Sequence, residues 1–332
     1  MIIKSFLPSR IVTNSDLEQE FPEWTAEKIE EKVGILSRHV ASEKETALDL
    51  AEQACLGLFR EHPEVKDSVD YLLLCTQSPD YCLPGNSSIL QDRLGLPPSI
   101  GALDYNLGCS GYIYGLSLAK GLLVSRISKG VLLVTAETYT KRINQKDKGN
   151  RSIFGDAATA TFLTEKDAES IGDFVLGTYG AGAENLIVRN GGMRFREGAT
   201  EEKTYGSGNI YTDDDLYMDG PEIFNFTIDI VPSLIKKTLK KNGLEQKDIN
   251  LFVLHQANSY ILNFLRKINR IPENQFYLNM KNTGNTVSST IPIALEDGFK
   301  SGLIHAGDKV LLAGFGVGYS YGATILTVPQ PL

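Results

Sequence analysis

Cys109 is the residue of this chain whose type and setting best suit nucleophilic catalysis. It lies in the segment NLGCSGYIYGL, directly before a largely apolar stretch that we expect to be helical. A thiol at the start of a helix faces the positive end of the helix dipole and free backbone N–H groups, which lower its pKa and favour the thiolate. Gly108 and Gly111 leave room for a substrate carbonyl. The competing interpretation is a small core residue, the usual fate of a free cysteine.

Two further residues could assist a thiolate at Cys109. His255 directly follows the apolar run LFVL, and Asn285 lies in the loop NTGNT before another apolar stretch. An imidazole can act as acid, base or hydrogen-bond donor, and a side-chain amide can donate to a developing oxyanion. Each residue also has an ordinary structural interpretation, because a histidine at a strand end is often merely hydrogen-bonded and Asn beside Gly normally marks a turn.

The glycine-rich segment GFGVGYSYG (314–322) follows the apolar run VLLA. Glycine spacing alone is a weak nucleotide-binding signal, and neither a matching acidic residue nor a P-loop lysine accompanies it. We interpret the segment as a tight backbone crossing that aims an N–H group into the pocket. Together with the N–H of Cys109, that group would form an oxyanion hole.

The elements that must position these residues alternate between short apolar runs and helical stretches, which is typical of an α/β fold. We expect Gly111 to Val124 to form a helix that is buried nearly all round. Gly180 to Gly220 reads as a long polar insertion, in which Asp213–Asp215 forms a solvated turn. The buried strands that we expect are Tyr71–Cys75, Val131–Ala136, Ala158–Leu163, Leu251–Leu254, Val310–Ala313 and Thr324–Val328.

An internal repeat relates the two halves of the chain. A shift of 179 residues places YLLLCTQ (71–77) on NLFVLHQ (250–256) and KGVLLV (129–134) on DKVLLA (308–313). In the first half of the chain, Cys109 lies between YLLLCTQ and KGVLLV. In the second half, NTGNTVSST (282–290) takes the corresponding place, with Asn285 offset by three residues. We therefore predict two duplicated, pseudo-symmetric α/β halves packed in layers, residues 1–170 and 171–332.

Duplication explains how distant residues could meet. Ligands of open α/β sheets bind at the carboxyl ends of the strands. Two related halves packed together bring those ends toward a common centre, so that Cys109 of the first half could meet His255 and Asn285 of the second in one pocket.

Composition excludes several other classes of protein. The 332 residues carry a net charge of −8, which argues against nucleic-acid binding. No apolar stretch is long enough to span a membrane and no signal peptide is evident, so we expect a cytoplasmic enzyme. The four cysteines and four histidines have no disulfide-framework or zinc-like spacing, so we expect no metal site.

At this point the motifs resemble those of the β-ketoacyl-acyl-carrier-protein synthase III family, the initiating condensing enzymes with a thiolase fold. The resemblance runs from about Ser9 to Val328. It is carried by GILSRHVA (34–41), NLGCSGYIYGL (106–116), IFGDAATA (153–160), LHQAN (254–258), NTGNTVSSTIP (282–292) and FGVGYSYGA (315–323).

The resemblance implies a two-step reaction in fatty-acid or related biosynthesis, with no cofactor beyond thioester substrates. Cys109 would take an acyl group from coenzyme A or from an acyl-carrier protein. Malonyl-acyl-carrier protein would then lose carbon dioxide while His255 and Asn285 hold the enolate oxygen. The N–H groups of Cys109 and Val317 would form the oxyanion hole, and Phe315 and Gly316 would contact the substrate.

The chain departs from the family where coenzyme A is bound. Lys28 and Lys32 stand where the family has a tryptophan and an arginine, Trp24 lies four residues further out, and Lys148 replaces a second arginine. A lysine cannot reproduce the planar stacking of arginine on adenine. A carrier-protein donor or a specialised pathway therefore stays open alongside coenzyme A.

The resemblance also implies a homodimer. The matching partner-reaching loop is PDYCLPGNSS (79–88), in which Leu83 would enter the other subunit's active site. The family's carrier-protein-docking arginine after HQAN is replaced by Tyr260, and Arg266 and Lys267 could supply the basic patch. Two alternatives to the condensing enzyme remain: an acyltransferase that passes the acyl group to an oxygen or nitrogen nucleophile, and a catalytically silent half of a heterodimer.

Overall fold

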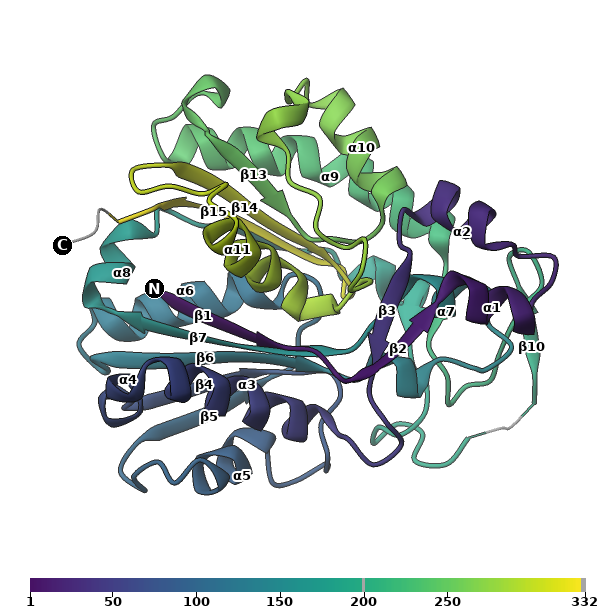
Figure 1. Ribbon diagram of the computed structural model, residues 1–332, viewed down its shortest axis with the longest axis horizontal. Coiled ribbons are helices and arrows are strands. Elements are labelled where there is room, and N and C mark those ends of the chain that lie inside the picture. Colours follow the sequence, from purple (N-terminus) through teal and green to yellow (C-terminus); the bar gives the residue numbers. More distant parts are fainter. Residues whose placement is uncertain (199–200, 330–332) are drawn as a thin grey trace.

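The computed structural model describes residues 1–198 and 201–329, and the last three residues of the second predicted half lie outside this range. Its strands form two main sheets that stack through a shared layer of helices (Figure 1). This is the layered arrangement of two α/β units that the repeat predicts. No helix of the described residues is both long and apolar enough to cross a membrane.

The first sheet has the order β1-β7-β6-β4-β5. Strands β4, β5 and β6 are parallel, whereas β7 runs antiparallel to both β6 and β1. Fully buried strands such as β4 and β6 carry near-continuous apolar runs because helices cover both faces of the sheet. The bounds are β1 (Ile2–Phe6), β4 (Tyr71–Cys75), β5 (Gly101–Tyr105), β6 (Gly130–Glu137) and β7 (Ala157–Thr164).

The second sheet has the order β13-β14-β15-β8, in which β13 and β14 are parallel and the remaining pairs antiparallel. The bounds are β8 (Val175–Thr178), β13 (Leu251–Leu254), β14 (Lys309–Gly316) and β15 (Ser320–Thr327). The repeat is visible here, since β4 and β6 of the first sheet correspond to β13 and β14 of the second. All six predicted strands are present. The glycine-rich segment extends β14 to Gly316 and starts β15 at Ser320, so it forms a hairpin and β15 begins earlier than expected.

Two helices fill the space between the sheets. Helix α6 (Gly111–Val124), at the predicted residues, contacts β4 and β6 of the first sheet and β14 and β15 of the second, while α11 (Thr290–Lys300) contacts β1, β7 and β13. Small residues allow this close approach, because a Cβ at Gly111 or Gly115 would collide with Cys75 or Tyr105. The two helices therefore begin at the centre of the molecule, just after Cys109 and Asn285.

Outer helices complete the layers. Helix α3 (Ala47–Glu61) covers the far face of the first sheet and α9 (Gly220–Lys241) the far face of the second. The other helices and strands are α1 (Asn14–Glu20), α2 (Ala26–Val33), α4 (Pro63–Ser68), α5 (Asn86–Arg93), α7 (Lys148–Ile153), α8 (Glu165–Ser170), α10 (Ser259–Ile268), β2 (Arg10–Thr13), β3 (Ser37–Val40), β9 (Leu186–Ile187), β10 (Lys203–Tyr205), β11 (Asn209–Tyr211) and β12 (Tyr217–Met218). Strands β9 to β12 pair as two short ribbons within the predicted insertion.

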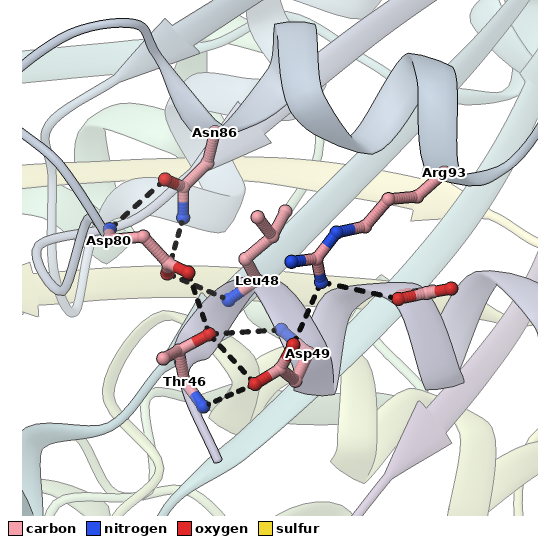
Figure 2. A network of polar contacts seen from close by, with 7 residues as sticks. Thr46, Leu48, Asp49, Asp80, Asn86 and Arg93 are labelled. Carbon is pink, nitrogen blue, oxygen red and sulfur yellow. Dashed lines mark hydrogen bonds and ion pairs between the residues drawn. The ribbon is translucent and has the colours of Figure 1, made fainter. Parts of the chain in front are cut away.

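The loop between β4 and α5, which contains Leu83, is held at both ends (Figure 2). Asp80 accepts a hydrogen bond of 2.8 Å from the Thr46 hydroxyl, at the cap of α3, and its backbone N–H donates to the Asn86 side chain at 3.1 Å. Arg93 of α5 reaches back to Asp49 of α3 at 2.8 Å. The loop thus projects from a fixed base, and the Leu83 side chain at its tip is 78% exposed.

Candidate active site

Cys109 lies in the short connection between β5 and α6, and its side chain is 8% exposed. Burial raises the pKa of the Cys109 thiol to about 12, against hydrogen bonds from the backbone of Val317 and of Cys109 itself that lower it. The expectation of a lowered pKa is therefore wrong for this state. A helix terminus contributes at most about 2 kcal/mol, or roughly 1.5 pKa units, and the loss of hydration at a buried sulfur is larger.

The end of β14 passes directly over Cys109. A Cβ at Gly316 would lie 2.6 Å from the Cys109 sulfur, and one at Gly314 would lie 2.7 Å from the Cys109 carbonyl oxygen. Glycine is therefore required by the close approach of two backbones. This crossing brings the Val317 N–H to the sulfur, as the sequence predicts, so that the amides of Val317 and Cys109 converge there.

His255 follows β13 and is buried beside the pocket. Its backbone N–H donates to the Ala313 carbonyl at 2.8 Å, and its ring Nδ1 lies 2.8 Å from the Thr290 hydroxyl oxygen. Burial lowers the pKa of His255 to about 3, so the imidazole is neutral at physiological pH. The ring meets Phe315 edge-on, with centroids 5.9 Å apart. Because Nδ1 of His255 is in contact with Thr290, Nε2 is the ring nitrogen that remains for a substrate.

Asn285 is fixed by backbone bonds to the segment before β7. Its N–H donates to Ile153 at 2.9 Å and its carbonyl accepts from Gly155 at 3.0 Å. The side-chain Oδ1 accepts from the Val287 N–H at 2.9 Å, which leaves the Nδ2 amino group as its donor. Val287 has φ of 57°, a left-handed conformation that is strained for a β-branched residue and is found mostly where function requires it.

The structure brings the three predicted residues together. Cys109, His255 and Asn285 line one cavity of about 330 Å³, together with Phe315 and Gly316. The rest of the lining is mainly apolar and comes from α9, α10 and the insertion. A few polar groups converging in a largely apolar cavity is the usual form of a site for a small-molecule group.

Only one of the three predicted coenzyme-binding lysines lines this cavity. Lys32 does so, and its Nζ lies 4.9 Å from the centroid of the Trp24 ring. Lys148 forms an ion pair with the Glu23 side chain at 2.8 Å, and Lys28 donates to the Glu23 carbonyl at 3.2 Å. The three lysines therefore surround the segment that holds Trp24, near the cavity but not all inside it.

The other predicted residues lie away from this cavity. Leu83 is in the loop between β4 and α5 and does not line the cavity. Arg266 is on α10, 3.7 Å from Glu273, with a largely buried side chain, whereas Lys267 beside it is exposed. Neither basic residue touches Cys109, His255 or Asn285, so any role for them is in docking rather than in chemistry.

The sequence reasoning missed two residues that support the site. Thr290, the first residue of α11, contacts the His255 ring. Glu137 at the end of β6 is fully buried, which raises its pKa to about 8, and it accepts hydrogen bonds from the backbone of Gln77 and from the hydroxyls of Ser78 and Ser288. The position of Glu137 at the carboxyl end of a central strand is the sequence feature that could have indicated its role.

Comparisons with known proteins identify the family of the chain. The family model described as 3-oxoacyl-[acyl-carrier-protein (ACP)] synthase III matches residues 103–180, and its C-terminal counterpart matches residues 239–328. The chain is 32% identical to a β-ketoacyl-[acyl-carrier-protein] synthase III of Clostridium tetani over 97% of this chain and 95% of the relative, and 33% identical to one of Halalkalibacterium halodurans over 98% and 96%.

Solved structures of the same family share the fold of this chain. A crystal structure of a 3-oxoacyl-(acyl-carrier-protein) synthase III superposes with a TM-score of 0.96 at 46% identity, over 98% of both chains. The β-ketoacyl-[acyl carrier protein] synthase III of Thermus thermophilus has a TM-score of 0.86 at 32% identity, over 99% of this chain and 98% of the other. OleA of Xanthomonas campestris, at 16% identity, shares the fold with a TM-score of 0.81.

Proposed function

The chain belongs to the 3-oxoacyl-[acyl-carrier-protein] synthase III family, and on that premise we propose that it condenses an acyl thioester with malonyl-acyl-carrier protein. The product is a 3-oxoacyl thioester, and carbon dioxide is released. The observation that carries the proposal is that Cys109, His255 and Asn285 line one cavity, with two backbone amides at the sulfur. The reaction uses thioester substrates and requires no metal or organic cofactor.

In the first step the Cys109 sulfur attacks the carbonyl of the acyl thioester. A bond forms between the sulfur and the carbonyl carbon, the bond from that carbon to the donor's sulfur breaks, and the thiol proton leaves with the donor thiol. The oxyanion of the tetrahedral intermediate receives hydrogen bonds from the N–H groups of Cys109 and Val317. Each such preorganised donor contributes about 3–4 kcal/mol of transition-state stabilisation.

In the second step the malonyl group loses its carboxylate. The carbon–carbon bond to the carboxylate breaks, carbon dioxide leaves, and the electron pair passes into the enolate of the remaining thioester. Asn285 Nδ2 and His255 Nε2 donate hydrogen bonds to the enolate oxygen. Donation from Nε2 requires Nδ1 to accept. The Thr290 hydroxyl lies 2.8 Å from Nδ1 and 3.1 Å from the Val287 carbonyl oxygen, so in this tautomer its single hydrogen turns from that carbonyl to the ring.

In the third step the enolate carbon attacks the carbonyl of acyl-Cys109. A new carbon–carbon bond forms, the bond to the Cys109 sulfur breaks, and the sulfur takes up a proton from solvent, which replaces the one that left with the donor thiol. The neutral state of His255 suits this sequence, because a neutral ring can share a proton with an oxyanion without bringing a charge into an apolar cavity.

Recognition of the thioester's carrier begins at Lys32, the cation at the cavity. A lysine ammonium offers a point charge that suits a phosphate, which both coenzyme A and the carrier protein's prosthetic arm contain. The Trp24 ring beside Lys32 offers an aromatic surface at the same place. We propose that this pair takes the place of the family's tryptophan and arginine, and that Arg266 and Lys267 lie on the carrier-protein side.

A homodimer is supported by the exposed apolar side chains around one edge of the molecule. Strand β5 has a free edge, and an unpaired edge is a ready template for pairing with a second copy. Leu103 of this strand and Leu83 of the loop after β4 are both exposed. We propose that two copies pair here and that the fixed loop of Figure 2 carries Leu83 to the neighbouring subunit.

The test is to supply a panel of acyl thioesters, measure the mass added to Cys109, and then add malonyl-acyl-carrier protein and measure carbon dioxide. We expect an acyl adduct followed by carbon dioxide and 3-oxoacyl product in equal amounts. Acyl transfer to an amine or alcohol without carbon dioxide would instead establish an acyltransferase. A chain that forms no adduct with any thioester would be inconsistent with catalysis by this cysteine.

A further inference from the structure

A second cavity, of about 310 Å³, lies next to the first, since Leu186 lines both. Val317, whose backbone N–H faces the Cys109 sulfur, lines it. Tyr139, another lining residue, packs in the same apolar cluster as Cys109. Gln77 also lines it and stands next to Gly108, where a Cβ would come 2.6 Å from its side-chain oxygen. Cys109 lines the first cavity, and the second is bounded by Tyr139 and Val317, which belong to the same apolar cluster as Cys109.

The proposed reaction needs both cavities. During condensation the acyl group remains on the Cys109 sulfur while the malonyl thioester occupies the cavity of His255 and Asn285. The two groups cannot share one space, so the acyl chain must extend into a different one. We assign it to the second cavity, which shares Leu186 with the first and is lined by Val317, the residue whose backbone N–H contacts the sulfur.

The lining of this second cavity is mixed, because Leu186, Ile187, Val188 and Leu216 are apolar whereas Gln77, Asn190 and Arg142 are polar. Gln77 donates to Asn106 at 2.8 Å and accepts from the Tyr139 hydroxyl, so these groups are already satisfied. Arg142, at the end of the turn that carries Tyr139, also lines the cavity and is exposed. A short hydrocarbon stem can pack against the apolar residues, but an apolar end at the polar residues would bury their surface without new hydrogen bonds, which is unfavourable.

Arg142 has no acidic partner within 4.0 Å in the described part of the chain, whereas Arg93, Arg151 and Arg189 each have one. Glu137, which is held behind Gln77 and Ser78, has a pKa raised to about 8 by burial and is therefore protonated at neutral pH. It does not repel an anion there. A guanidinium is well suited to bind a carboxylate through two parallel hydrogen bonds.

We propose that the acyl group accepted by Cys109 ends in a carboxylate, and that Arg142 is the specificity-determining residue that binds it. The substrate class is the monothioester of a short dicarboxylic acid. This inference rests on the proposed function, since it concerns the first of the two substrates. The covalent step is unchanged: the Cys109 sulfur replaces the donor sulfur on the acyl carbon, and the distal carboxylate takes no part in bond making.

The experiment compares acids with neutral analogues of the same length. Succinyl- and glutaryl-coenzyme A are each set against the coenzyme A thioester of the corresponding monomethyl ester, and against butyryl-coenzyme A. Intact-mass measurement gives the initial rate at which each acyl group is added, and peptide mapping places it at Cys109. We expect the carboxylate to raise the rate of acylation at low substrate concentration about tenfold or more over the methyl ester.

Two variants isolate the role of Arg142. Arg142→Gln should remove the preference for the carboxylate and leave the rate with butyryl-coenzyme A within about threefold, whereas Arg142→Lys should keep part of the preference. Lys146→Gln is the matched control, because Lys146 is a nearby cation on the same segment that pairs with Glu202 on the surface. It should change nothing.

The outcomes separate this inference from the proposed function. Faster acylation by the neutral thioesters, or a carboxylate preference that persists in Arg142→Gln, overturns the inference while condensation still stands. An enzyme that takes no acyl group from any thioester refutes the proposed function itself. Thermal unfolding and gel filtration of Arg142→Gln show whether an unfolded or dissociated protein accounts for a lost rate.

Discussion

Replacing Gly316 with alanine tests the close approach on which the site depends. The new Cβ would lie 2.6 Å from the Cys109 sulfur and 2.7 Å from its Cβ. Non-bonded carbon contacts are optimal at about 3.5–4.0 Å, so the two groups must separate by about 1 Å. The backbone conformation of Gly316 is open to alanine, since its φ is not positive. The predicted effect is therefore steric and local.

The size of the effect follows from what the displacement disrupts. A shift of about 1 Å in a reacting group costs on the order of 100-fold in rate, and loss of one oxyanion donor costs about 100- to 1,000-fold. Moving the sulfur also moves it away from the Val317 N–H. We therefore expect Gly316→Ala to acylate 100- to 1,000-fold more slowly than the wild type.

The assay is the rate of the Cys109 acyl adduct, followed by intact mass under single-turnover conditions. Gly121→Ala is the matched control, because Gly121 lies in α6 with no atom within 4 Å of an added Cβ. That variant should gain up to about 1 kcal/mol in unfolding free energy and acylate normally. If Gly316→Ala acylates within threefold of the wild type, the geometry assigned to the sulfur and the β14 crossing is incorrect.

Further predictions concern the catalytic residues and pH. Cys109→Ala should form no acyl adduct, whereas His255→Ala and Asn285→Ala should acylate but release no carbon dioxide from malonyl-acyl-carrier protein; normal condensation by Asn285→Ala would reject its enolate role. Because burial raises the pKa of the Cys109 thiol to about 12, alkylation by iodoacetamide should accelerate about tenfold per pH unit from pH 7 to 9, and a plateau near pH 8 would contradict this. Because burial lowers the pKa of His255 to about 3, the pH profile of carbon dioxide release should contain no step from this imidazole between pH 5 and 8; an NMR titration of the His255 ring should likewise show no chemical-shift change in this range. The folded-state pKa of Glu137, about 8, lies above its ordinary value of 4.5, so the folded state binds the extra proton and its stability falls as pH rises between those values; urea unfolding of Glu137→Gln should show a smaller fall than the wild type from pH 5 to 8.

The fold and the central residues could be predicted because both follow from patterns that the sequence displays. The apolar runs at β4, β6, β13 and β14 have the length of buried strands, and their shared offset indicates the duplication. The carboxyl ends of such strands are where ligands bind, which is why Cys109, His255 and Asn285 could be expected in one cavity.

The electrostatics of the site could not be predicted in this way. The thiol pKa of Cys109 depends on how far the surrounding layers exclude water, and only the packed structure determines that. Thr290 could not be assigned to the His255 ring either, because the two residues are 35 positions apart and the sequence between them gives no sign of the 2.8 Å contact. The proposed role of Arg142 could not be predicted either, because the insertion that encloses its cavity has no regular sequence period.

The loop between β4 and α5, which carries Leu83, is ordered before two subunits associate. Hydrogen bonds at Asp80 and Asn86 already restrict the conformations of this loop in the isolated subunit. Packing the loop against a second subunit therefore costs little conformational entropy, so less of the favourable free energy of association is offset by ordering the loop. Cutting the tether, for example with Asp80→Ala, should weaken self-association although Asp80 itself would touch no part of the neighbouring subunit.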